Sequence, residues 1–417
     1  MWIYNIKLVE HQGIFDGKLE YSQESGMITK ITHQKSVSSV IKDNGIDGKG
    51  QYLCSGMVDI HVHFRDLNQS HKETLESGMK AAVHGGITTV FDMPNKDPIV
   101  DNVEILNKLN NKASKISEID IFNYMLVNKT SVSQLVKEDN PSKFWKVVFG
   151  GTTNVESENY DIITEFSKLV KDTTFLAIHA EDSDLIKENL KRFYPTYDNH
   201  DIIRSKEVEI KSVERSLQSI NKSNNKAITY HFAHITTESA LEHLLNNKRE
   251  NLSWEVTPHH LFLNTKNVIK LKEKGFVNPP LRDKISQESL LKNYLENKIP
   301  IIATDHAPHT LEEKVNYSLS GFPNLDTVIP VMVTNNIPLW LLVETYSYNP
   351  SKLMNLSDRG EISVGKLADL ILIDPKNELT VKSELIQSKA KWSPWDGEKL
   401  KGWVSKTWKR GKIVFER

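Results

Sequence analysis

The stretch GMVDIHVHFRD, residues 56–66, places His61 and His63 two positions apart in an otherwise apolar run. Side chains at positions i and i+2 of a strand point to the same face, so both imidazoles would face one interior point. Buried polar groups are costly unless hydrogen bonds or a ligand satisfy them. These two histidines therefore either have hydrogen-bond partners or bind something together, and a metal ion is one candidate.

Further polar residues stand at or near the ends of later apolar segments. They are Asn95, Lys146, His179, His234 and Asp305. A single histidine or aspartate in such a place is usually a hydrogen-bonded core or surface residue. Their recurrence at successive strand ends instead predicts one shared site. With 15 histidines and 1 cysteine in the chain, its metal ligands would be imidazoles and carboxylates.

Lys146 interrupts the apolar run FWKVVFGG, residues 144–151, on the same face as Val148. A lysine in such a run ordinarily extends its ammonium group toward solvent, and Lys143 ahead of the run is typical of the surface. Beside metal cations, however, an ammonium group at Lys146 would be repelled. A lysine with a lowered pKa can react with carbon dioxide to give an anionic carbamate, which offers one oxygen to each of two metal ions.

The elements that must position these residues are apolar segments separated by amphipathic stretches of helix length. The segments are MVDIHVHF, GITTVFDMPN, IDIFNYMLV, FWKVVFGG, TTFLAIHAED, AITYHFAHITT, NLSWEVTPHH and IPIIATDHAPH. Stretches such as KETLESGMKAAVHGG, residues 72–86, lie between them. This alternation predicts an α/β fold, and its extent in one unit favours a closed (β/α)8 TIM-like barrel with the active site at the carboxyl ends of its strands.

Both ends of the chain have a different pattern, in which short strands alternate with turns and no long helix is predicted. The segments are WIYNIKLV, MITKITHQ and GIDGKGQYLCSG near the start, and GEISVGKLADLILIDP and WVSKTWKRGKIVFER near the end. We expect residues 1–55 and 360–417 to form one small flanking β domain, a β-sandwich built from both termini. Residues 56–359 would form the barrel.

Composition limits the classes of function. The 417 residues include 53 Lys and Arg and 54 Asp and Glu, a formal charge of −1, so no overall field favours nucleic acid or an anionic membrane. The N-terminus has no apolar signal region and no later run approaches the length of a membrane span, which argues against secretion and membrane insertion. Cys54 is the only cysteine, which excludes an internal disulfide and fits the reducing cytoplasm.

Several motifs together resemble those of a known family. DIHVHFRD, MPN, KVVFGGTT, HAED, HFAHITT, EVTPHH, NPPLR and ATDHAPH follow one another in the order and spacing of the dihydroorotases, members of the amidohydrolase superfamily. GEISVGKLADLILIDP is similar to that superfamily's flanking β domain. The resemblance extends from about residue 50 to the C-terminus and is specific as a set, whereas single motifs would not be.

The resemblance implies a binuclear zinc site. Its ligands would be His61, His63 and Asp305 for the more buried ion, His179 and His234 for the other, and N6-carboxylated Lys146 as the bridge. His231, His259 and His260 would have structural or supporting roles. Asp305 would also take a proton from the attacking water and pass it to the leaving ring nitrogen.

The resemblance also implies the substrate, a cyclic amide that carries a carboxylate. Arg65 follows His63 by two residues, and its guanidinium group suits a carboxylate. Arg65, Asn95 and His309 would bind that carboxylate, and Asn278 would lie near the ring. Arg282 in NPPLR matches the motif without an assigned role.

The chain departs from the family pattern at two places. Leu67 and Asn68 replace the usual Pro-Gly turn after the arginine motif. Asn324 and Asp326 stand where Gly and Glu are common, in a loop expected to contact the substrate, so substrate affinity is more open to change than the chemistry. A variant of the site with an aspartate in place of the bridging lysine fits less well, because FGGTT supplies no such aspartate.

We therefore expect a zinc-dependent dihydroorotase, which interconverts N-carbamoyl-L-aspartate and (S)-dihydroorotate in de novo pyrimidine biosynthesis. The alternatives are another cyclic-amide hydrolase, such as an allantoinase or hydantoinase, and a catalytically silent scaffold for aspartate transcarbamoylase. A metal-free barrel that binds a sugar or nucleotide would leave the buried lysine and histidines unexplained. The resemblance leaves open a homodimer and an association with aspartate transcarbamoylase as partners.

Overall fold

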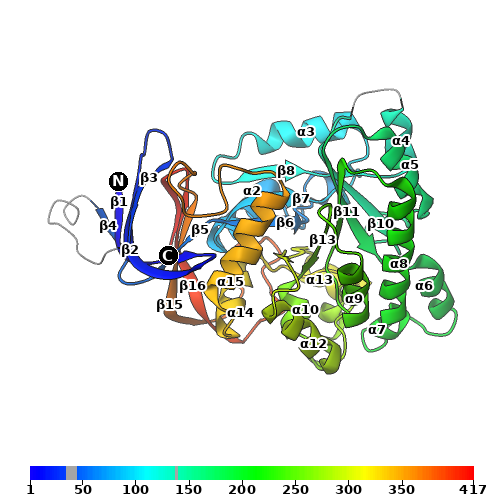
Figure 1. The fold of residues 1–417 in the computed structure, drawn as a ribbon. Helices are drawn as coiled ribbons and strands as arrows, with labels where there is room; N and C mark the ends of the chain where they lie inside the picture. The colour runs from blue at the N-terminus through cyan, green and yellow to red at the C-terminus, as the bar shows by residue number, and fades with distance from the viewer. Residues whose placement is uncertain (34–44, 137–139) are drawn as a thin grey trace.

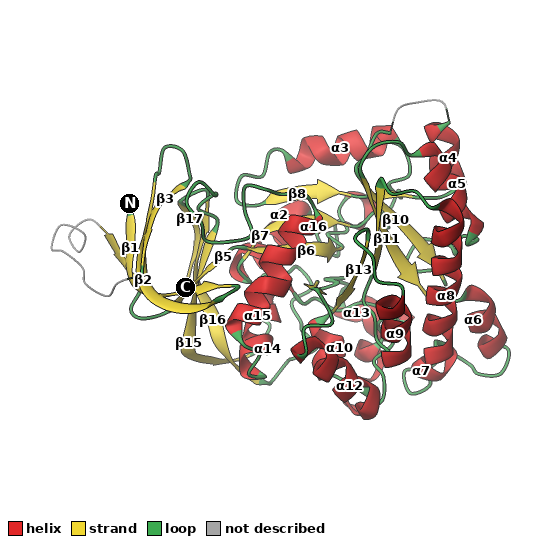
Figure 2. Ribbon diagram, in the orientation of Figure 1, coloured by secondary structure: helices red, strands yellow, loops and turns green. Residues whose placement is uncertain are grey.

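The computed structural model describes residues 1–33, 45–136 and 140–417. Figures 1 and 2 show a strand-rich part that contains both chain ends beside a larger barrel of strands and helices. Within these ranges no helix is long and apolar enough to cross a membrane. The last residue of the predicted strand MITKITHQ, Gln34, lies outside the described residues.

The barrel consists of parallel strands that follow one another around a closed ring. They are β6 (Met57–Val62), β7 (Ile87–Asp92), β8 (Asp120–Asn123) with its continuation β9 (Met125–Leu126), β10 (Phe144–Phe149), β11 (Thr174–Ala180), β12 (Ile228–Phe232), β13 (Leu252–Val256) and β14 (Ile301–Ile302). β6 to β8 form one parallel sheet and β9 to β14 another. A parallel bridge between Val62 and His306 joins the first strand to the last and closes the ring. The predicted barrel is therefore confirmed, and each predicted segment contains one strand position.

Helices lie between the strands and cover the barrel (Figure 2). The longer ones are α2 (Leu75–His84), α3 (Val103–Ala113), α5 (Asp161–Leu169), α6 (Ser183–Leu190), α8 (Lys206–Ser223), α9 (Glu238–Asn246) and α12 (Lys284–Leu295). The shorter ones are α4 (Lys129–Leu135), α7 (His200–Ile203), α10 (Pro258–Phe262), α11 (Thr265–Leu271), α13 (Leu311–Tyr317), α14 (Val328–Thr334), α15 (Leu339–Val343) and α16 (Asn349–Leu353), with single turns η1 (Leu67–Gln69), η2 (Lys272–Gly275), η3 (Leu325–Thr327) and η4 (Glu344–Tyr348).

Local sequence explains why strands and helices alternate. The barrel strands are buried on both faces, so they are nearly continuous runs of Val, Ile, Phe and Leu, as parallel strands usually are. Helix α2 begins where the Thr74 side chain accepts a hydrogen bond from the Ser77 backbone, and the Ser77 side chain accepts one from the Thr74 backbone. Its buried face includes Leu75, Ala81 and Ala82, which pack in the main core.

Strands from both termini share one sheet. They are β1 (Trp2–Glu10), β2 (Gly13–Tyr21), β3 (Ile28–Thr32), β4 (Gly45–Asp47), β5 (Tyr52–Ser55), β15 (Leu370–Thr380), β16 (Lys399–Lys409) and β17 (Lys412–Glu416). The order is β17-β16-β15-β5-β1-β2-β3, with β4 beside β1. The antiparallel pairing of β15 with β5 joins the two ends of the chain, which confirms the flanking β domain. The division at residues 56 and 360 and the sandwich form stay predictions.

A charged cluster ties this terminal sheet to the barrel. Asp120 at the start of β8 accepts hydrogen bonds from Lys409 at 2.7 Å, Arg410 at 3.0 Å and the Arg359 guanidinium. Lys409 also pairs with Asp369 at 2.7 Å. Burial opposes ionisation of Asp120, but Lys409 and Arg359 outweigh it and hold the pKa of this carboxyl well below its usual range.

Asp120→Asn should lower the free energy of unfolding by about 2 kcal/mol, because the buried Lys409 and Arg359 each lose one of their two carboxylate partners. Since the folded-state pKa is depressed, the carboxylate stabilises the fold above its unfolded pKa of about 3.9, and this share is lost as the pH falls below it. Urea unfolding should therefore show a smaller difference in the free energy of unfolding between Asp120→Asn and the unmodified protein near pH 3 than at pH 7. Asp358→Asn, which removes a half-exposed partner of Arg359, is the matched control and should change little. A deficit independent of pH would contradict this account of the cluster.

Candidate active site

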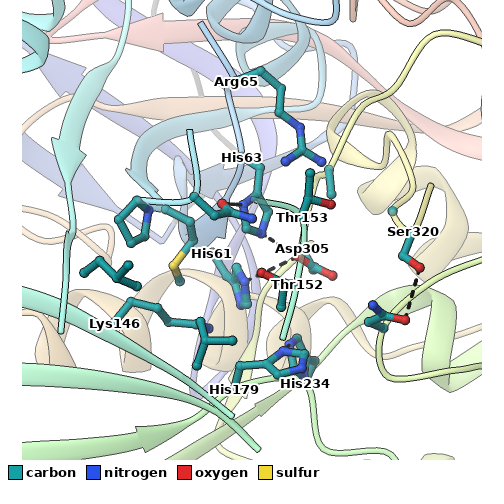
Figure 3. Close-up of a pocket in the computed structure, with 18 residues that line it drawn as sticks. His61, His63, Arg65, Lys146, Thr152, Thr153, His179, His234, Asp305 and Ser320 are labelled. Atoms are coloured by element: carbon teal, nitrogen blue, oxygen red, sulfur yellow. Dashed lines mark hydrogen bonds and ion pairs between the residues drawn. The ribbon is translucent and has the colours of Figure 1, made fainter. Parts of the chain in front are cut away.

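A pocket of about 530 Å³, open to solvent, lies at the carboxyl ends of the barrel strands. The predicted site residues that line it are His61, His63, Arg65, Asn95, Lys146, His179, His234, Asn278 and Asp305. His309 lies behind Arg65, within 3.0 Å of its guanidinium. Thr152, Thr153, Ser320 and Gly321 complete much of the lining and were not predicted. The carboxyl end of the barrel thus brings the predicted site residues to one place, and Figure 3 shows His61, His63, Arg65, Lys146, His179, His234 and Asp305 around the pocket.

His61, His63 and Asp305 form a group that could hold a metal ion, with one potential ligand atom each, all within 4.8 Å of one another. The Asp305 carboxylate lies 3.3 Å from His61 Nε2 and 3.0 Å from His63 Nε2. Each ring also has a partner on its other nitrogen, because His61 Nδ1 donates to Glu255 and His63 Nδ1 donates to Asn95. This assignment of protons leaves both Nε2 lone pairs facing Asp305 and a shared ion.

His179 and His234 form a second pair at the other side of the pocket (Figure 3). His179 Nδ1 lies 3.0 Å from His234 Nε2. His179 Nε2 donates to Glu181 at 2.9 Å, which leaves its Nδ1 as an acceptor. Two imidazole nitrogens bound to one tetrahedral zinc ion at about 2.0–2.1 Å would be separated by a little over 3 Å, so the pair has the spacing of two ligands.

Lys146 reaches into the pocket from the middle of β10 (Figure 3). Its residue surface is 4% exposed, and its Nζ has no hydrogen-bond partner among the described residues. Burial lowers the pKa of Lys146 to about 8, against the opposing influence of Glu255 and Asp305. At pH 7 about one amine in ten is then neutral and nucleophilic, far more than for an exposed lysine. An unpartnered buried amine beside two groups of imidazoles needs a chemical explanation.

The electrostatic environment keeps these histidines neutral, which is the form that binds metal. Burial lowers the pKa of His61 to about 4 and those of His63, His179 and His234 below their usual range. His234 and Asp305 also have left-handed backbones, with φ of 36° and 46°. Such conformations cost energy for residues other than glycine and are concentrated at functional sites.

The residues predicted to bind substrate lie on the side of the pocket away from Lys146. The guanidinium of Arg65 donates through Nε to the Pro308 carbonyl at 3.1 Å, and its buried Nη1 has no partner within the described part of the chain. Asn278 Oδ1 accepts hydrogen bonds from His200 at 2.9 Å and Ser320 at 3.1 Å. Both acceptor positions of that oxygen are then used, so the amide nitrogen remains as the donor toward the pocket.

Two carboxylates that orient the histidines were missed in the sequence. Glu255 accepts from His61 and, at 2.9 Å, from His231, while Glu181 accepts from His179 and from Arg204. Burial works against ionisation of Glu255, yet the two histidines lower its pKa below the usual range. Two signals were available in the sequence. Glu255 is a carboxylate inside an apolar strand, LSWEV. Glu181 follows His179 by two residues, directly after strand β11, which places both side chains on the same side of the chain.

The loop that contains the departures Asn324 and Asp326 reaches the pocket, but neither of these two side chains lines it. Both are buried behind the pocket, since the chain turns inward through η3. Asn324 donates to the Thr304 carbonyl at 3.1 Å, and Asp326 accepts from the Gln387 and Ser388 backbone at 2.8 and 3.1 Å. Ser320 and Gly321, just before these residues, line the pocket instead.

The other departure, at Leu67 and Asn68, begins the short turn η1. Arg65, Asp66 and Leu67 have left-handed φ of 52°, 56° and 48°. The Asp66 side chain accepts from the Leu67 and Leu75 backbone and from Lys112, which fixes this backbone without a Pro-Gly turn.

Comparison with known proteins identifies the family. The model of the amidohydrolase family matches residues 52–414, most of the chain. The chain belongs to the amidohydrolase family. Within this amidohydrolase family, it is 37% identical over 422 residues to a dihydroorotase of Pyrococcus abyssi, covering 100% of this chain and 93% of that protein. It is also 37% identical over 376 residues to a dihydroorotase of Pyrococcus horikoshii, covering 88% and 82%.

Solved structures support the amidohydrolase fold. The L-hydantoinase from Arthrobacter aurescens superposes with a TM-score of 0.90 and covers 100% of this chain and 96% of its own. Its sequence identity is 21%, so the likeness concerns the fold alone. Together with the dihydroorotase relatives, these matches confirm the family and the barrel with a flanking β domain that the sequence predicts.

Proposed function

We propose that this amidohydrolase is a dihydroorotase, which opens the ring of (S)-dihydroorotate to N-carbamoyl-L-aspartate and closes it in reverse, a step of de novo pyrimidine biosynthesis. The observation that carries the substrate assignment is Arg65, a buried guanidinium with a free Nη1 in the same pocket as the histidines. A buried cation of this kind needs an anionic partner, and the carboxylate of dihydroorotate provides one. The relatives named above are dihydroorotases, and this chain matches 93% and 82% of their lengths.

The donor set supports a metal centre of two zinc ions. His61, His63 and Asp305 would hold one ion, and His179 with His234 would hold the other. Imidazole and carboxylate are ligands that zinc accepts, and the neutral state of the rings suits this role. When bound, such ions lower the pKa of water and polarise the amide carbonyl under attack.

Carboxylated Lys146 would complete the centre. The ammonium group first loses one proton; the neutral amine then attacks carbon dioxide, a nitrogen–carbon bond forms, and the nitrogen releases a second proton, so that a cationic side chain becomes an anionic carbamate. The lowered pKa and the absence of a partner for Nζ within the described residues both favour this reaction. The two carbamate oxygens provide one ligand for each metal ion and remove the charge conflict of an ammonium group.

Asp305 is the residue that moves the proton. Its carboxylate lies 3.3 and 3.0 Å from the Nε2 atoms of His61 and His63, beside the position proposed for the first metal ion. We expect it to take a proton from the attacking water and deliver it to the ring nitrogen that leaves. In ring closure it would do the reverse.

Four other side chains would bind and orient the substrate. Arg65, Asn95 and His309 would hold the carboxylate, and the Asn278 amide would donate to the ring. Arg65→Met should raise the KM for dihydroorotate about 100-fold, because a charge-assisted pair with the carboxylate is lost. The KM for dihydrouracil, which lacks the carboxylate, should change little. Arg192→Met, at an exposed arginine, is the control, and an equal change in KM for both substrates would contradict the role of Arg65.

Turnover by zinc-loaded protein prepared with bicarbonate tests the function. We expect dihydroorotate to be hydrolysed with a kcat/KM at least 100 times that for hydantoin, allantoin or dihydrouracil. A preference for hydantoin or allantoin would transfer the assignment to another cyclic-amide hydrolase. Metal binding without turnover of any of these would favour the silent scaffold.

The resemblance to dihydroorotases also bears on the oligomeric state, the partner and the cellular location of the enzyme. A homodimer, an association with aspartate transcarbamoylase and a cytoplasmic location all stay proposals. Light scattering of the purified protein, alone and with an aspartate transcarbamoylase, checks the first two.

A further inference from the structure

Lys72 lies just before helix α2 and has no part in the proposed chemistry. Its side chain is 8% exposed, and Nζ lies 3.2 Å from His309 Nδ1 and 3.2 Å from the Glu313 carboxylate. A lysine is rarely so buried unless its charge is paired. Glu313 pairs with that charge from the start of α13, while the contact with His309 connects Lys72 to the predicted carboxylate site.

The contacts of His309 determine which ring nitrogen carries the proton. An ammonium group can only donate, so His309 Nδ1 must be the acceptor in its contact with Lys72. The proton is then on Nε2, which lies 3.1 Å from the Ser320 carbonyl and can donate to it. These two contacts agree on one tautomer.

Arg65 makes the third contact and conflicts with that tautomer. Its Nη2 lies 3.0 Å from His309 Nε2, and a guanidinium group also can only donate. Two donors therefore face each other across this contact, next to the free Nη1 of Arg65. An anion placed beside both groups would accept from both and resolve the conflict, as the substrate carboxylate would.

We propose that Lys72 is a positioning residue that holds His309 in the Nε2–H tautomer, so that His309 and Arg65 present their donors together to the substrate carboxylate. This proposal rests on the proposed function for the identity of the anion, but not for the tautomer. The ring is fully buried, and the Trp392 Nε1 donor holds the His309 backbone in place through its carbonyl at 2.9 Å. Burial also lowers the pKa of His309 well below its usual range, which keeps the ring neutral.

The first readout is the tautomer, measured by ¹⁵N NMR of histidine-labelled protein, with the His309 signals identified by their loss in His309→Asn. In the unmodified protein we expect a protonated Nε2 and an unprotonated Nδ1. Lys72→Met should give a mixture of tautomers, whereas Lys72→Arg, which retains a cationic donor, should restore the original pattern. Lys80→Met, at an exposed lysine of α2, should leave it unchanged.

The second readout is steady-state kinetics. Lys72→Met should raise the KM for dihydroorotate about tenfold with kcat within a factor of two, since binding of the carboxylate rather than proton transfer is affected. Lys72→Arg should remain within threefold of the original KM. A merely structural role would lower the melting temperature without altering the His309 pattern.

The outcomes separate this inference from the proposed function. An unchanged tautomer in a folded Lys72→Met variant overturns the inference, whatever the substrate. If Lys72→Met does not fold, Lys72→Leu decides, because loss of the donor with an unaltered KM and tautomer would overturn it equally. Failure of the unmodified protein to turn over dihydroorotate would overturn the proposed function, while the NMR result would still decide the role of Lys72.

Discussion

Lys146→Ala is expected to reduce kcat for dihydroorotate by at least about a thousandfold, the effect of losing some 4 kcal/mol of metal-dependent stabilisation of the transition state. Without the amine there is no carbamate, and the two groups of imidazoles lose the anionic ligand that would join their ions. Metal analysis of the same preparation should show clearly less zinc per chain than in the unmodified protein. Both quantities are needed, because a loss of turnover alone has many causes.

The neighbouring Lys143 provides a matched control for this experiment. It precedes the same strand and is exposed, so Lys143→Ala should keep both the metal content and kcat. A short carboxylic acid such as acetate could occupy the space left in Lys146→Ala and restore part of the turnover by supplying two oxygens. Full metal content and full activity in Lys146→Ala would show that Lys146 has no role at the centre.

Asp305→Asn is expected to lower kcat by about 10³- to 10⁴-fold, because the amide cannot accept and transfer the proton. The substitution preserves the shape of the side chain while removing its charge. The KM for dihydroorotate should change much less, since Arg65, Asn95 and His309 would still bind the carboxylate. The measurement is kcat at saturating zinc, so that weaker binding of the ion near His61 and His63 does not limit the rate.

Asp172→Asn, at an exposed aspartate just before β11, is the control for a general effect of charge and should retain kcat. The pH profile adds a second test, because the acidic limb of kcat should be altered in Asp305→Asn. A variant with full zinc content and undiminished kcat would contradict the assignment of proton transfer to Asp305.

The barrel was predictable because its strands are continuous apolar runs that end in polar residues. The segment TTFLAIHAED contains β11, Thr174–Ala180, and places His179 at its end. Parallel strands buried on both faces permit few other residue types, so sequence and structure agree closely there. Strand β2, Gly13–Tyr21, lies between β1 and β3 and was not predicted, because Gly13 and Gly17 are residues that strands rarely contain and turns favour.

The candidate site was predictable to the extent that its residues follow strand ends. His61, His63 and Asp305 come from strands that close the ring, so the barrel topology alone brings them together. The partners that orient them depend on contacts across the barrel. Glu255 contacts His61 from 194 positions away, and nothing local marks that pairing.

The directions in which loop side chains point could not be predicted from the sequence either. Asn324 and Asp326 belong to a loop expected to contact the substrate, yet their side chains bind Thr304, just after β14, and the segment near residue 388. Lys72 precedes α2, whereas His309 and Glu313 lie just before and at the start of α13, so their network arises only after the barrel has closed. Residues within strands follow periodicity, whereas loop residues follow the tertiary contacts available to them.

The most direct test of the central claim, a carbamate-bridged pair of metal ions at the end of this barrel, is a crystal structure of protein prepared with zinc and bicarbonate, with data recorded at the zinc absorption edge. We predict two anomalous peaks about 3.5–4 Å apart. One should lie against His61, His63 and Asp305, the other against His179 and His234, with continuous density beyond Lys146 Nζ toward both. A single peak, or a free Lys146 amine beside two fully occupied ions, would contradict the account.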